Sequence, residues 1–472
     1  MIPVKNYIKG EWAASSSGKS IASIDPANQE VVAEGPYSSI EDAEAAIAAA
    51  RELFDHSGWP FTEGQQRATI LLELARKLRA SADELALLIT RENGRPIHST
   101  RGEVLRSAEI AEYYAAQART LQGRSNLTVS NALSLVSYEP VGVCGLIVPW
   151  NFPIDLAVRK IAPALAAGCT IVLKPSLLVP ATSAALMRLF DEIDALPKGV
   201  VNMVIGDGPD VGDAIVRSPQ VDKISFTGAT TTGKAVLRAA ADTMKRVSLE
   251  CGGKSPNIIF DDAPLEQAIH SALWGTFHNS GQSCSAKSRV IVHESLHDTL
   301  ITELQKRVSQ IRVGWGTKAD TEVGPLVSQA QLDTVLSYIE IGLDEGAKRV
   351  TGGARMTGAE FERGFFIEPA VFDDVQPSMQ LAQHEIFGPV LAVMSFEDEE
   401  DAIALANATS FGLSAAIWTR DISRAMRVAR RVRSGEVMVN TSGMRLAEGP
   451  FGGYGQSGIG RELGDDVLLE YQ

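Results

Sequence analysis

Cysteine is scarce in this chain, and its cysteines lie far apart. Only four occur among 472 residues, at Cys144, Cys169, Cys251 and Cys284, and none belongs to a CxxC pair. Zinc cages need ligands at close spacing, and small disulfide-stapled domains need dense cysteine. The pattern therefore excludes both classes, and it favours the reducing environment of a cytoplasmic protein.

Long hydrophobic runs are also missing. The first residues, MIPVKNYIKGEW, lack the apolar core and the cleavage site of a secretory signal. The best apolar run, from Val141 to Pro149, contains two glycines and falls well short of the roughly 20 residues that cross a bilayer. We therefore expect no membrane partner.

Positive charge is in deficit. Lys and Arg number 44 against 58 Asp and Glu, so the formal net charge is −14. Such a field repels the phosphate backbone of nucleic acids, and we expect no nucleic-acid partner. It leaves room only for a local basic pocket that binds a small anion.

Strand and helix signals alternate over most of the chain, whose length and 45% hydrophobic content suit two or three domains with large cores. From Val141 onward, short apolar runs bounded by turn residues alternate with amphipathic segments, and a second such series starts at Asn257. This alternation predicts mostly parallel sheets that are covered on both faces. We therefore expect an α/β fold of two units, with a boundary near 251–256.

The residues before and between these series have their own patterns. A short strand region is expected at 5–12, and helices are expected at 43–54, 65–91 and 104–117, where apolar residues recur at helical spacing. The stretch 125–138 alternates at period two, which predicts a hairpin that projects from the body.

Two patterns spell known signatures in places that do not suit them. Residues 293–297 read HExxH, the zinc-protease signature, but His293 ends a β-branched run, so we expect a strand exit there. A zinc hydrolase that uses His293 and His297 stays open as an alternative. Residues 453–458 read GxGxxG but follow no strand and leave no room for a βαβ unit, so we expect a glycine-rich loop under an active site.

Three residues could together perform covalent catalysis. Cys284 lies in a loop of small polar residues, NSGQSCS, which suits a nucleophilic thiol better than apolar surroundings do. Glu250, followed closely by two glycines, could act as a general base. Asn151 lies between two prolines directly after a strand, where a rigid carboxamide N–H could stabilise an oxyanion. Each of the three also fits a purely structural role when it is taken alone.

A dinucleotide site is indicated at 226–233 and at Lys174. The stretch FTGATTTG follows a predicted strand and opens a helix, so its glycines would let a pyrophosphate approach the N–H groups at the start of that helix. Lys174 ends another predicted strand, where a cation can meet a ribose or a phosphate in an α/β sheet. An ordinary glycine turn and a solvated lysine are the alternatives.

Together these segments resemble the aldehyde dehydrogenase superfamily, from about residue 5 to the last residue. The order and spacing of the matching segments are highly specific to that family. The segments are PWNFP at 149–153, LKPS at 173–176, FTG…G at 226–233, ECGGKSP at 250–256, GQSC at 281–284, EIFGP at 385–389 and PFGGYGQSGIGRE at 450–462.

The resemblance implies NAD(P)-dependent oxidation of an aldehyde to a carboxylate. Cys284 would form a thiohemiacetal and then a thioester, and Asn151 with the Cys284 N–H would stabilise the oxyanion. Glu250 would activate the hydrolytic water, and its presence favours hydrolysis over transfer of the acyl group to coenzyme A. NAD or NADP would be the cofactor, and the implied cofactor-binding residues are Val148, Trp150, Lys174, Ser176, Leu177, Gly208, Phe226, Gly228, Ala229, Gly233, Glu385 and Phe387.

The resemblance also implies a three-part architecture. A Rossmann-like dinucleotide-binding domain would comprise 1–120 and 139–250, and an α/β catalytic domain would comprise 251–440. A small β oligomerisation arm at 121–138 and the tail at 441–472 would join copies into a homodimer or a homotetramer.

Several positions depart from the family pattern. Leu177 stands where the family often has a Glu that binds the ribose diol, so the choice between NAD and NADP is open. Ala229 replaces a frequent Ser. Cys251 replaces the Leu that usually follows the general base Glu250, and this thiol could be an oxidation site or could only fill space in the packing. The family usually continues past Gln472 with one more strand.

The implied substrate-binding residues are Phe152, Arg159, Arg445 and Phe451. The two arginines fall at positions near the aldehyde tunnel and could hold a carboxylate by bidentate hydrogen bonds. They could also point outward into ion pairs, and Arg159 occurs in relatives that oxidise aromatic aldehydes. Semialdehydes of diacids and aromatic aldehydes are therefore both open as substrates. A catalytically silent relative that only binds the cofactor is a further alternative, although the intact catalytic set argues against it.

Overall fold

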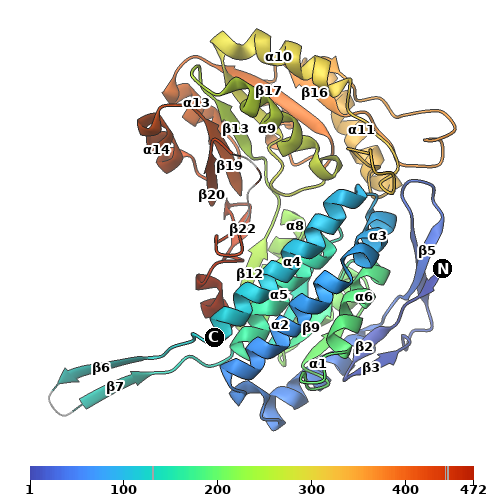
Figure 1. Ribbon diagram of the computed structural model, residues 1–472, viewed down its shortest axis with the longest axis vertical. Helices are drawn as coiled ribbons and strands as arrows, with labels where there is room; N and C mark the ends of the chain where they lie inside the picture. Colours follow the sequence, from blue (N-terminus) through green and yellow to red (C-terminus); the bar gives the residue numbers. More distant parts are fainter. Residues whose placement is uncertain (130–131, 442, 444–445) are drawn as a thin grey trace.

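Two open sheets, each in its own lobe, organise the chain (Figure 1). The computed structural model describes residues 1–129, 132–441, 443 and 446–472. The sheets are mostly parallel and carry helices on both faces, so the α/β fold expected from the alternation of strands and helices is confirmed.

The first sheet has eight strands, and its five central strands are parallel. Every residue of its three middle strands is buried, because helices cover both faces. Leu146 packs with helices α2, α4, α5 and α6, and its neighbour Ile147 packs on the other face with α1, α7 and α8. In spatial order the strands are β22 (Gly458–Ile459), β12 (Arg246–Glu250), β11 (Lys223–Thr227), β8 (Val143–Ile147), β9 (Thr170–Lys174), β10 (Val201–Met203), β2 (Asn6–Ile8) and β3 (Glu11–Ala13).

The second sheet has seven strands, of which only β15 runs antiparallel to its neighbour. Ile258 on one face packs with α11, α12 and α14, and Ile259 on the other packs with α9 and α10. In spatial order the strands are β15 (Lys348–Thr351), β16 (Ala370–Asp373), β17 (Val390–Phe396), β14 (Arg289–His293), β13 (Pro256–Ile259), β19 (Ser414–Trp418) and β20 (Glu436–Val439).

The helices divide between the lobes. Those of the first are α1 (Ile40–His56), α2 (Gly64–Ala80), α3 (Ala82–Asn93), α4 (Ile97–Ala118), α5 (Pro153–Ala167), α6 (Pro180–Asp191), α7 (Asp213–Arg217) and α8 (Thr230–Ala240). Those of the second are α9 (Leu265–Phe277), α10 (Glu294–Val308), α11 (Gln329–Asp344), α12 (Gln380–Gln383), α13 (Glu399–Ala406) and α14 (Ile422–Arg431). None of the described helices is both long and apolar enough to span a bilayer.

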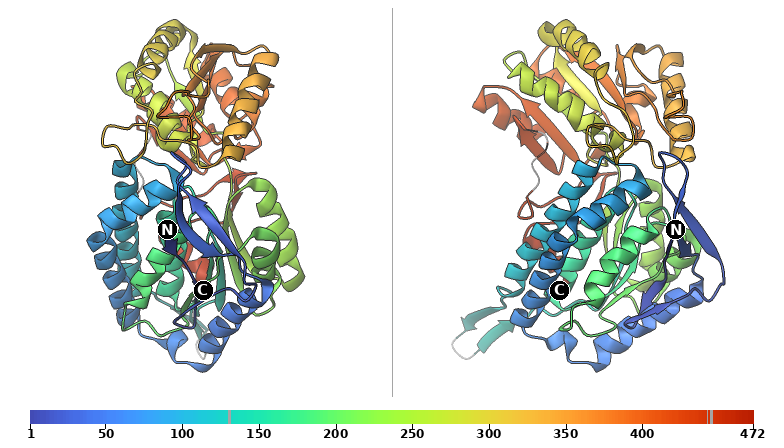
Figure 2. Two further views of the ribbon diagram at one scale, coloured as in Figure 1. Left: turned by 90° about the vertical axis from the view of Figure 1, so that its right-hand side faces the viewer. Right: turned by 45° about the vertical axis from the view of Figure 1, so that its right-hand side comes forward.

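Smaller strands connect and extend the lobes. β1 (Ile2–Pro3), β5 (Val31–Pro36) and β4 (Ser20–Ile24) form a three-stranded sheet, and β18 (Phe411–Gly412) pairs with β21 (Tyr454–Gly455). The loop between β4 and β5 reaches the upper lobe, where the Phe365 N–H donates to Pro26 O at 3.0 Å (Figure 2). The chain ends in the short helix η5 (Asp466–Tyr471), which packs against α5.

A hairpin of β6 (Arg124–Val129) and β7 (Ala132–Val136) projects from the lower lobe, as the alternation at 125–138 predicts (Figure 1). Its register pairs Leu127 with Leu133 and Ser125 with Leu135, so the three leucines share one face. They are 77%, 61% and 72% exposed in the single chain.

Two sequence-based expectations differ in detail from the structure. The strand region at 5–12 is a hairpin, because Lys9 and Gly10 have φ values of 54° and 83° and form a tight two-residue turn. The helical pattern at 65–91 is divided between α2 and α3, since Ser81, with φ −98° and ψ 13°, ends one helix and begins the next. Periodicity alone cannot show a break that preserves the apolar face.

Candidate active site

Cys284 lies in a sharply bent loop that follows α9. Asn279, Ser280 and Gly281 have φ values of 53°, 55° and 73°, three consecutive residues in the left-handed region. A Cβ at Gly281 would lie 2.0 Å from Gly388 O, so the loop packs directly against the EIFGP segment. The Gln282 side chain fixes the bend, because its Nε2 donates to Asn279 O at 3.2 Å and its Oε1 accepts from Val327 N at 2.9 Å. Such over-determined, strained loops are typical of functional sites.

Asn151 joins this loop from the first lobe. Its side chain is buried, and its Nδ2 donates to Gln282 O at 3.1 Å, two residues before Cys284. The main-chain oxygen of Asn151 accepts from Asn279 Nδ2 at 3.3 Å and from Arg95 Nη1 at 3.1 Å. The structure therefore brings the predicted oxyanion donor and the predicted nucleophile loop together.

A buried ion pair between Arg95 and Glu103 stabilises the Asn151 segment from behind. Glu103 Oε1 accepts from the main-chain N–H groups of Ile154 and Asp155, at 2.9 and 3.1 Å, in the first turn of α5. A carboxylate at a helix N-terminus is stabilising, and here α4 supplies the cap that the loop itself lacks. This pair is not among the residues predicted from the sequence, although an acidic residue in the apolar pattern of α4 is a detectable signal.

Glu250 ends β12 in a buried pocket. Neither of its carboxylate oxygens has a hydrogen-bond partner among the described residues. Burial raises the pKa of Glu250 well above its usual value, and the nearby Glu462 carboxylate raises this pKa further, while Lys160 and Arg461 oppose the shift. Glu462 is itself paired with the buried Lys160, whose Nζ also donates to Thr227 Oγ1 at 2.7 Å. A buried carboxyl group with a raised pKa is suited to taking up a proton.

The glycine-rich stretch near the end of the chain lies against this glutamate. Gly458 pairs with Glu250 across β22 and β12, and a Cβ at Gly452 would lie 2.6 Å from Glu250 Oε1. The GxGxxG stretch is thus a turn between two short strands, β21 and β22, and it lies beside Glu250.

A groove of about 790 Å³ opens at the carboxyl ends of β8, β9 and β11. It is lined by eight of the residues proposed to bind the cofactor, namely Val148, Lys174, Ser176, Leu177, Gly208, Phe226, Gly228 and Ala229. Gly228 is required there, because a Cβ would lie 2.6 Å from Cζ of the Phe226 ring. Burial lowers the pKa of Lys174 to about 8, against the opposing effect of Asp207, which also lines the groove and was not identified from the sequence.

The other four residues proposed for the cofactor lie outside the lining of this groove. Trp150 and Phe387 meet edge to face, with ring centroids 5.6 Å apart. Glu385 Oε1 accepts from Gly253 N at 3.2 Å, and burial raises the pKa of Glu385 to about 7. Gly233 packs on Cys251, since a Cβ there would lie 2.7 Å from Cys251 Sγ.

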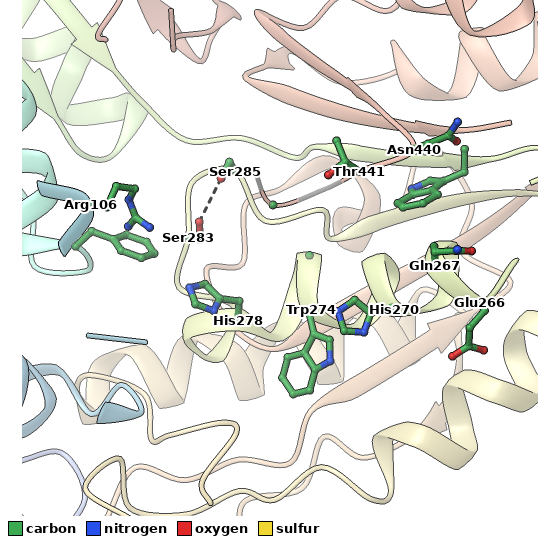
Figure 3. Close-up of a pocket in the computed structure, with 14 residues that line it drawn as sticks. Arg106, Glu266, Gln267, His270, Trp274, His278, Ser283, Ser285, Asn440 and Thr441 are labelled. Atoms are coloured by element: carbon green, nitrogen blue, oxygen red, sulfur yellow. Dashed lines mark hydrogen bonds between the residues drawn. The ribbon is translucent and has the colours of Figure 1, made fainter. Parts of the chain in front are cut away.

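A second cavity, of about 960 Å³, lies next to the Cys284 loop (Figure 3). Ser283 and Ser285, the two neighbours of Cys284, both line it, as does Phe152, whose ring stacks on His278 with centroids 6.2 Å apart. Its remaining described lining residues include Arg106, Glu266, Gln267, His270, Trp274, Trp418 and Asn440.

Two of the other residues proposed for the substrate, Arg159 and Phe451, do not belong to the described lining of this cavity. Arg159 is 2% exposed, pairs with Asp155 at 2.6 Å, and places its guanidinium 5.4 Å from the centroid of the Phe451 ring. Phe451 is buried. Arg445 lies outside the described residues.

The HExxH residues have separate roles. His293 caps α10, with its Nδ1 accepting from Ser295 N at 3.2 Å, and His297 Nε2 lies 2.8 Å from Asp373 Oδ1. Among the described residues, no cluster of His, Cys, Asp or Glu could hold a metal ion. The zinc hydrolase alternative therefore has no observation in its favour.

Comparison with known proteins agrees with this geometry. The aldehyde dehydrogenase family matches residues 12–472. A betaine aldehyde dehydrogenase of Bacillus subtilis is 44% identical, over 98% of this chain and 95% of its own length. The crystal structure of betaine aldehyde dehydrogenase from Staphylococcus aureus in complex with NAD+ matches with a TM-score of 0.97 at 39% identity, over 99% of this chain and 93% of that one. The structure of an NAD+ complex of aldehyde dehydrogenase from Bacillus cereus matches with a TM-score of 0.97 at 41% identity, over 99% of this chain and 95% of that one. The chain belongs to the aldehyde dehydrogenase family, and it is an enzyme of that class.

Proposed function

We propose that the protein oxidises an aldehyde to a carboxylate with NAD as hydride acceptor, and that Cys284, Glu250 and Asn151 perform the reaction. The observation that supports this best is the hydrogen bond from the Asn151 carboxamide to the Cys284 loop. The buried Glu250 carboxylate, which has no hydrogen-bond partner among the described residues, adds to this support. These are the nucleophile, base and oxyanion donor that acyl chemistry on a thiol needs.

Each residue has a defined step. The Cys284 thiolate attacks the aldehyde carbon, and Asn151 Nδ2 with the Cys284 N–H stabilises the resulting oxyanion. NAD, when bound, accepts the hydride that leaves this carbon, which converts the thiohemiacetal to a thioester. A water molecule then attacks the thioester, and Glu250 takes a proton from that water. Lys160 and Glu462 determine the charge around Glu250. The carboxylate product leaves and the thiolate is restored.

The groove at the first sheet suits NAD. Its glycine turn at Gly228 and the start of α8 fit a pyrophosphate, and Lys174 fits a ribose hydroxyl. Leu177 supplies no carboxylate, but Asp207 and Asp213 line the groove and would repel a 2′-phosphate. We therefore propose NAD over NADP, with Trp150, Phe387 and Glu385 on the nicotinamide side.

For the substrate, we propose an acidic semialdehyde or an aromatic aldehyde. Phe152, Trp274 and Trp418 line the second cavity and support a ring. Arg106 in the same lining, with Arg159 on the shared Asp155, supports an anion. The relatives' names suggest betaine aldehyde as a third candidate, for which the same aromatic side chains could bind a quaternary ammonium group.

A panel of aldehydes tests this function. Reduction of the nicotinamide, followed by its absorbance with NAD and NADP separately, should show turnover with NAD and a preference within the panel. Turnover with neither cofactor on any aldehyde would refute it and favour the silent alternative.

We further propose that the chain divides into a dinucleotide-binding domain (1–120 and 139–250), a catalytic domain (251–440) and an oligomerisation arm and tail (121–138 and 441–472).

A cytoplasmic location is proposed because none of the four cysteines, all in the described part of the chain, forms a disulfide.

The arm is proposed to join copies into a homodimer or homotetramer through the leucines at 127, 133 and 135. Leu135→Asp should raise the dissociation constant of the oligomer at least about tenfold, because burying one leucine contributes roughly 1.5–3 kcal/mol. Ser134→Asp, on the opposite face of β7, is the matched control and should leave assembly unchanged. Light scattering over a dilution series measures both, and equal behaviour of the two variants would refute the arm as the interface.

A further inference from the structure

The cavity next to the Cys284 loop has an unequal distribution of charge. Arg106 and Glu266 are its two formally charged residues within the described lining. Both carboxylate oxygens of Glu266 accept from Arg307, each at 2.7 Å, and Arg307 also pairs with Glu303 at 3.0 Å, so Glu266 has both of its oxygens engaged by a cation. Figure 3 shows Arg106 at the opposite end of the cavity from Glu266.

The charge of Arg106 is only partly compensated. Arg106 Nε donates to Asp155 Oδ1 at 3.0 Å, but Asp155 also holds Arg159 Nη2 at 2.6 Å. One carboxylate thus serves two guanidinium groups, and the neighbouring Arg95–Glu103 pair is neutral as a unit. Among the described residues, the carboxylate that bonds Arg106 is therefore shared with a second guanidinium, while Glu109 acts on Arg106 only through its charge.

Arg106 is the arginine of the two that a substrate can reach. Its side chain is 34% exposed and lines the cavity, whereas that of Arg159 is 2% exposed and does not. Among the described residues, the terminal nitrogens Nη1 and Nη2 of Arg106 have no hydrogen-bond partner, so a bidentate pair remains available. Asp155 holds Nε, which orients those nitrogens without using them.

We propose that Arg106 selects the substrate by binding a carboxylate at the far end of the aldehyde, so that the enzyme prefers aldehydes with an anionic tail. This inference rests on the proposed function, since it concerns the same cavity and the same Cys284. A guanidinium pairs with a carboxylate in a planar, bidentate geometry, which fixes the direction of the substrate as well as its charge. Arg159 acts indirectly in this proposal, because it pairs with the same Asp155 carboxylate that holds Arg106.

The same charge acts against cations. A quaternary ammonium group at this end of the cavity would meet the Arg106 guanidinium, and like charges at close range disfavour binding. The aromatic residues that could enclose such a group lie in the same cavity, so Arg106 decides between the two kinds of tail. In this respect we expect the chain to differ from the relatives named for betaine aldehyde.

Three para-substituted benzaldehydes test the proposal, because they share one ring and differ in charge: 4-carboxybenzaldehyde, benzaldehyde and 4-(trimethylammonio)benzaldehyde. In the unaltered enzyme, kcat/KM should be highest for the carboxylate and lowest for the cation. Arg106→Met should lower kcat/KM for the carboxylate by about tenfold to a hundredfold, the usual effect of losing a charge-assisted hydrogen bond, mostly through KM. The same substitution should change kcat/KM for benzaldehyde by less than about threefold, and it should raise kcat/KM for the cationic aldehyde. Arg106→Lys should retain part of the preference.

Arg101→Met is the matched control, since Arg101 lies on the same helix but is exposed and paired with Asp83. It should leave all three substrates unchanged. An equal loss on all three in Arg106→Met would show that Arg106 only stabilises the fold, and a wild-type enzyme indifferent to the charge would equally overturn the proposal.

A binding measurement separates this proposal from the proposed function. Terephthalate, an unreactive dianion of the same shape, is titrated calorimetrically into the holoenzyme and into Arg106→Met. Weaker binding to the variant supports Arg106 even if no aldehyde is oxidised, whereas equal affinity refutes it even if oxidation proceeds.

Discussion

Cys284→Ser should reduce aldehyde oxidation to the background rate. The reaction needs a thiolate that attacks the carbonyl and later leaves as a thioester, and a serine hydroxyl is a far weaker nucleophile at neutral pH. Loss of a covalent nucleophile in a comparable hydrolytic site costs about a million-fold in rate. Initial rates with saturating NAD and aldehyde measure the effect, and unchanged thermal unfolding shows that the variant is folded.

Cys251→Ala is the matched control for that experiment. Cys251 lies next to Glu250 in sequence, but its thiol is buried against Gly233, and burial raises its pKa to about 12. A thiol that stays protonated is no nucleophile, so this variant should retain activity within about threefold. Residual activity in Cys284→Ser together with loss in Cys251→Ala would reverse the two assignments.

The elements around Cys284 show which parts of the fold and of the site can be predicted from the sequence. The alternation of short apolar runs and amphipathic segments predicts both sheets, because parallel strands buried on both faces leave that pattern. Local chemistry, such as a cysteine among small polar residues, identified Cys284, Glu250 and Asn151 as candidates. Their joint action could not be derived locally, since Asn151 meets the Cys284 loop across more than 130 residues of chain.

The sequence alone does not predict which carboxylates compensate the charges of Arg106 and Arg159. Asp155 and Arg159 stand at i,i+4 on α5, a spacing that predicts their ion pair, but nothing in the sequence shows that Arg106 on α4 shares the same carboxylate. The exposure of Arg106 in the cavity follows from how α4 packs on α5, a tertiary contact that periodicity does not specify. The same holds for the Arg95–Glu103 pair, which caps α5 from another helix. The sequence can mark such a residue, as it does Glu103 in the apolar pattern of α4, but the neighbour through which the residue acts is found only in the folded chain.

Glu250→Gln should separate the two halves of the reaction. The nucleophile and the oxyanion donor stay intact, so the first turnover should proceed and leave the thioester on Cys284. Hydrolysis should then slow by about 10²–10⁴-fold, the usual contribution of a general base. A rapid-mixing experiment should record a burst of reduced nicotinamide equal to the enzyme concentration, followed by a slow steady state. A variant that shows neither burst nor steady state would place Glu250 in the first half instead.

The pH dependence of hydrolysis supplies an independent check on the charge around this base. Only the carboxylate form of Glu250 can accept a proton, and its pKa is raised by burial first and by the Glu462 charge second. Hydrolysis should therefore be slow below this raised pKa and increase as the pH rises through it. Glu462→Gln removes the repulsion and leaves the positive charge of Lys160 nearby, so the pKa of Glu250 should fall and the ascending limb should move to lower pH. An unmoved limb, or one at higher pH, would mean that Glu462 acts on Lys160 alone and that another group titrates in the deacylation step.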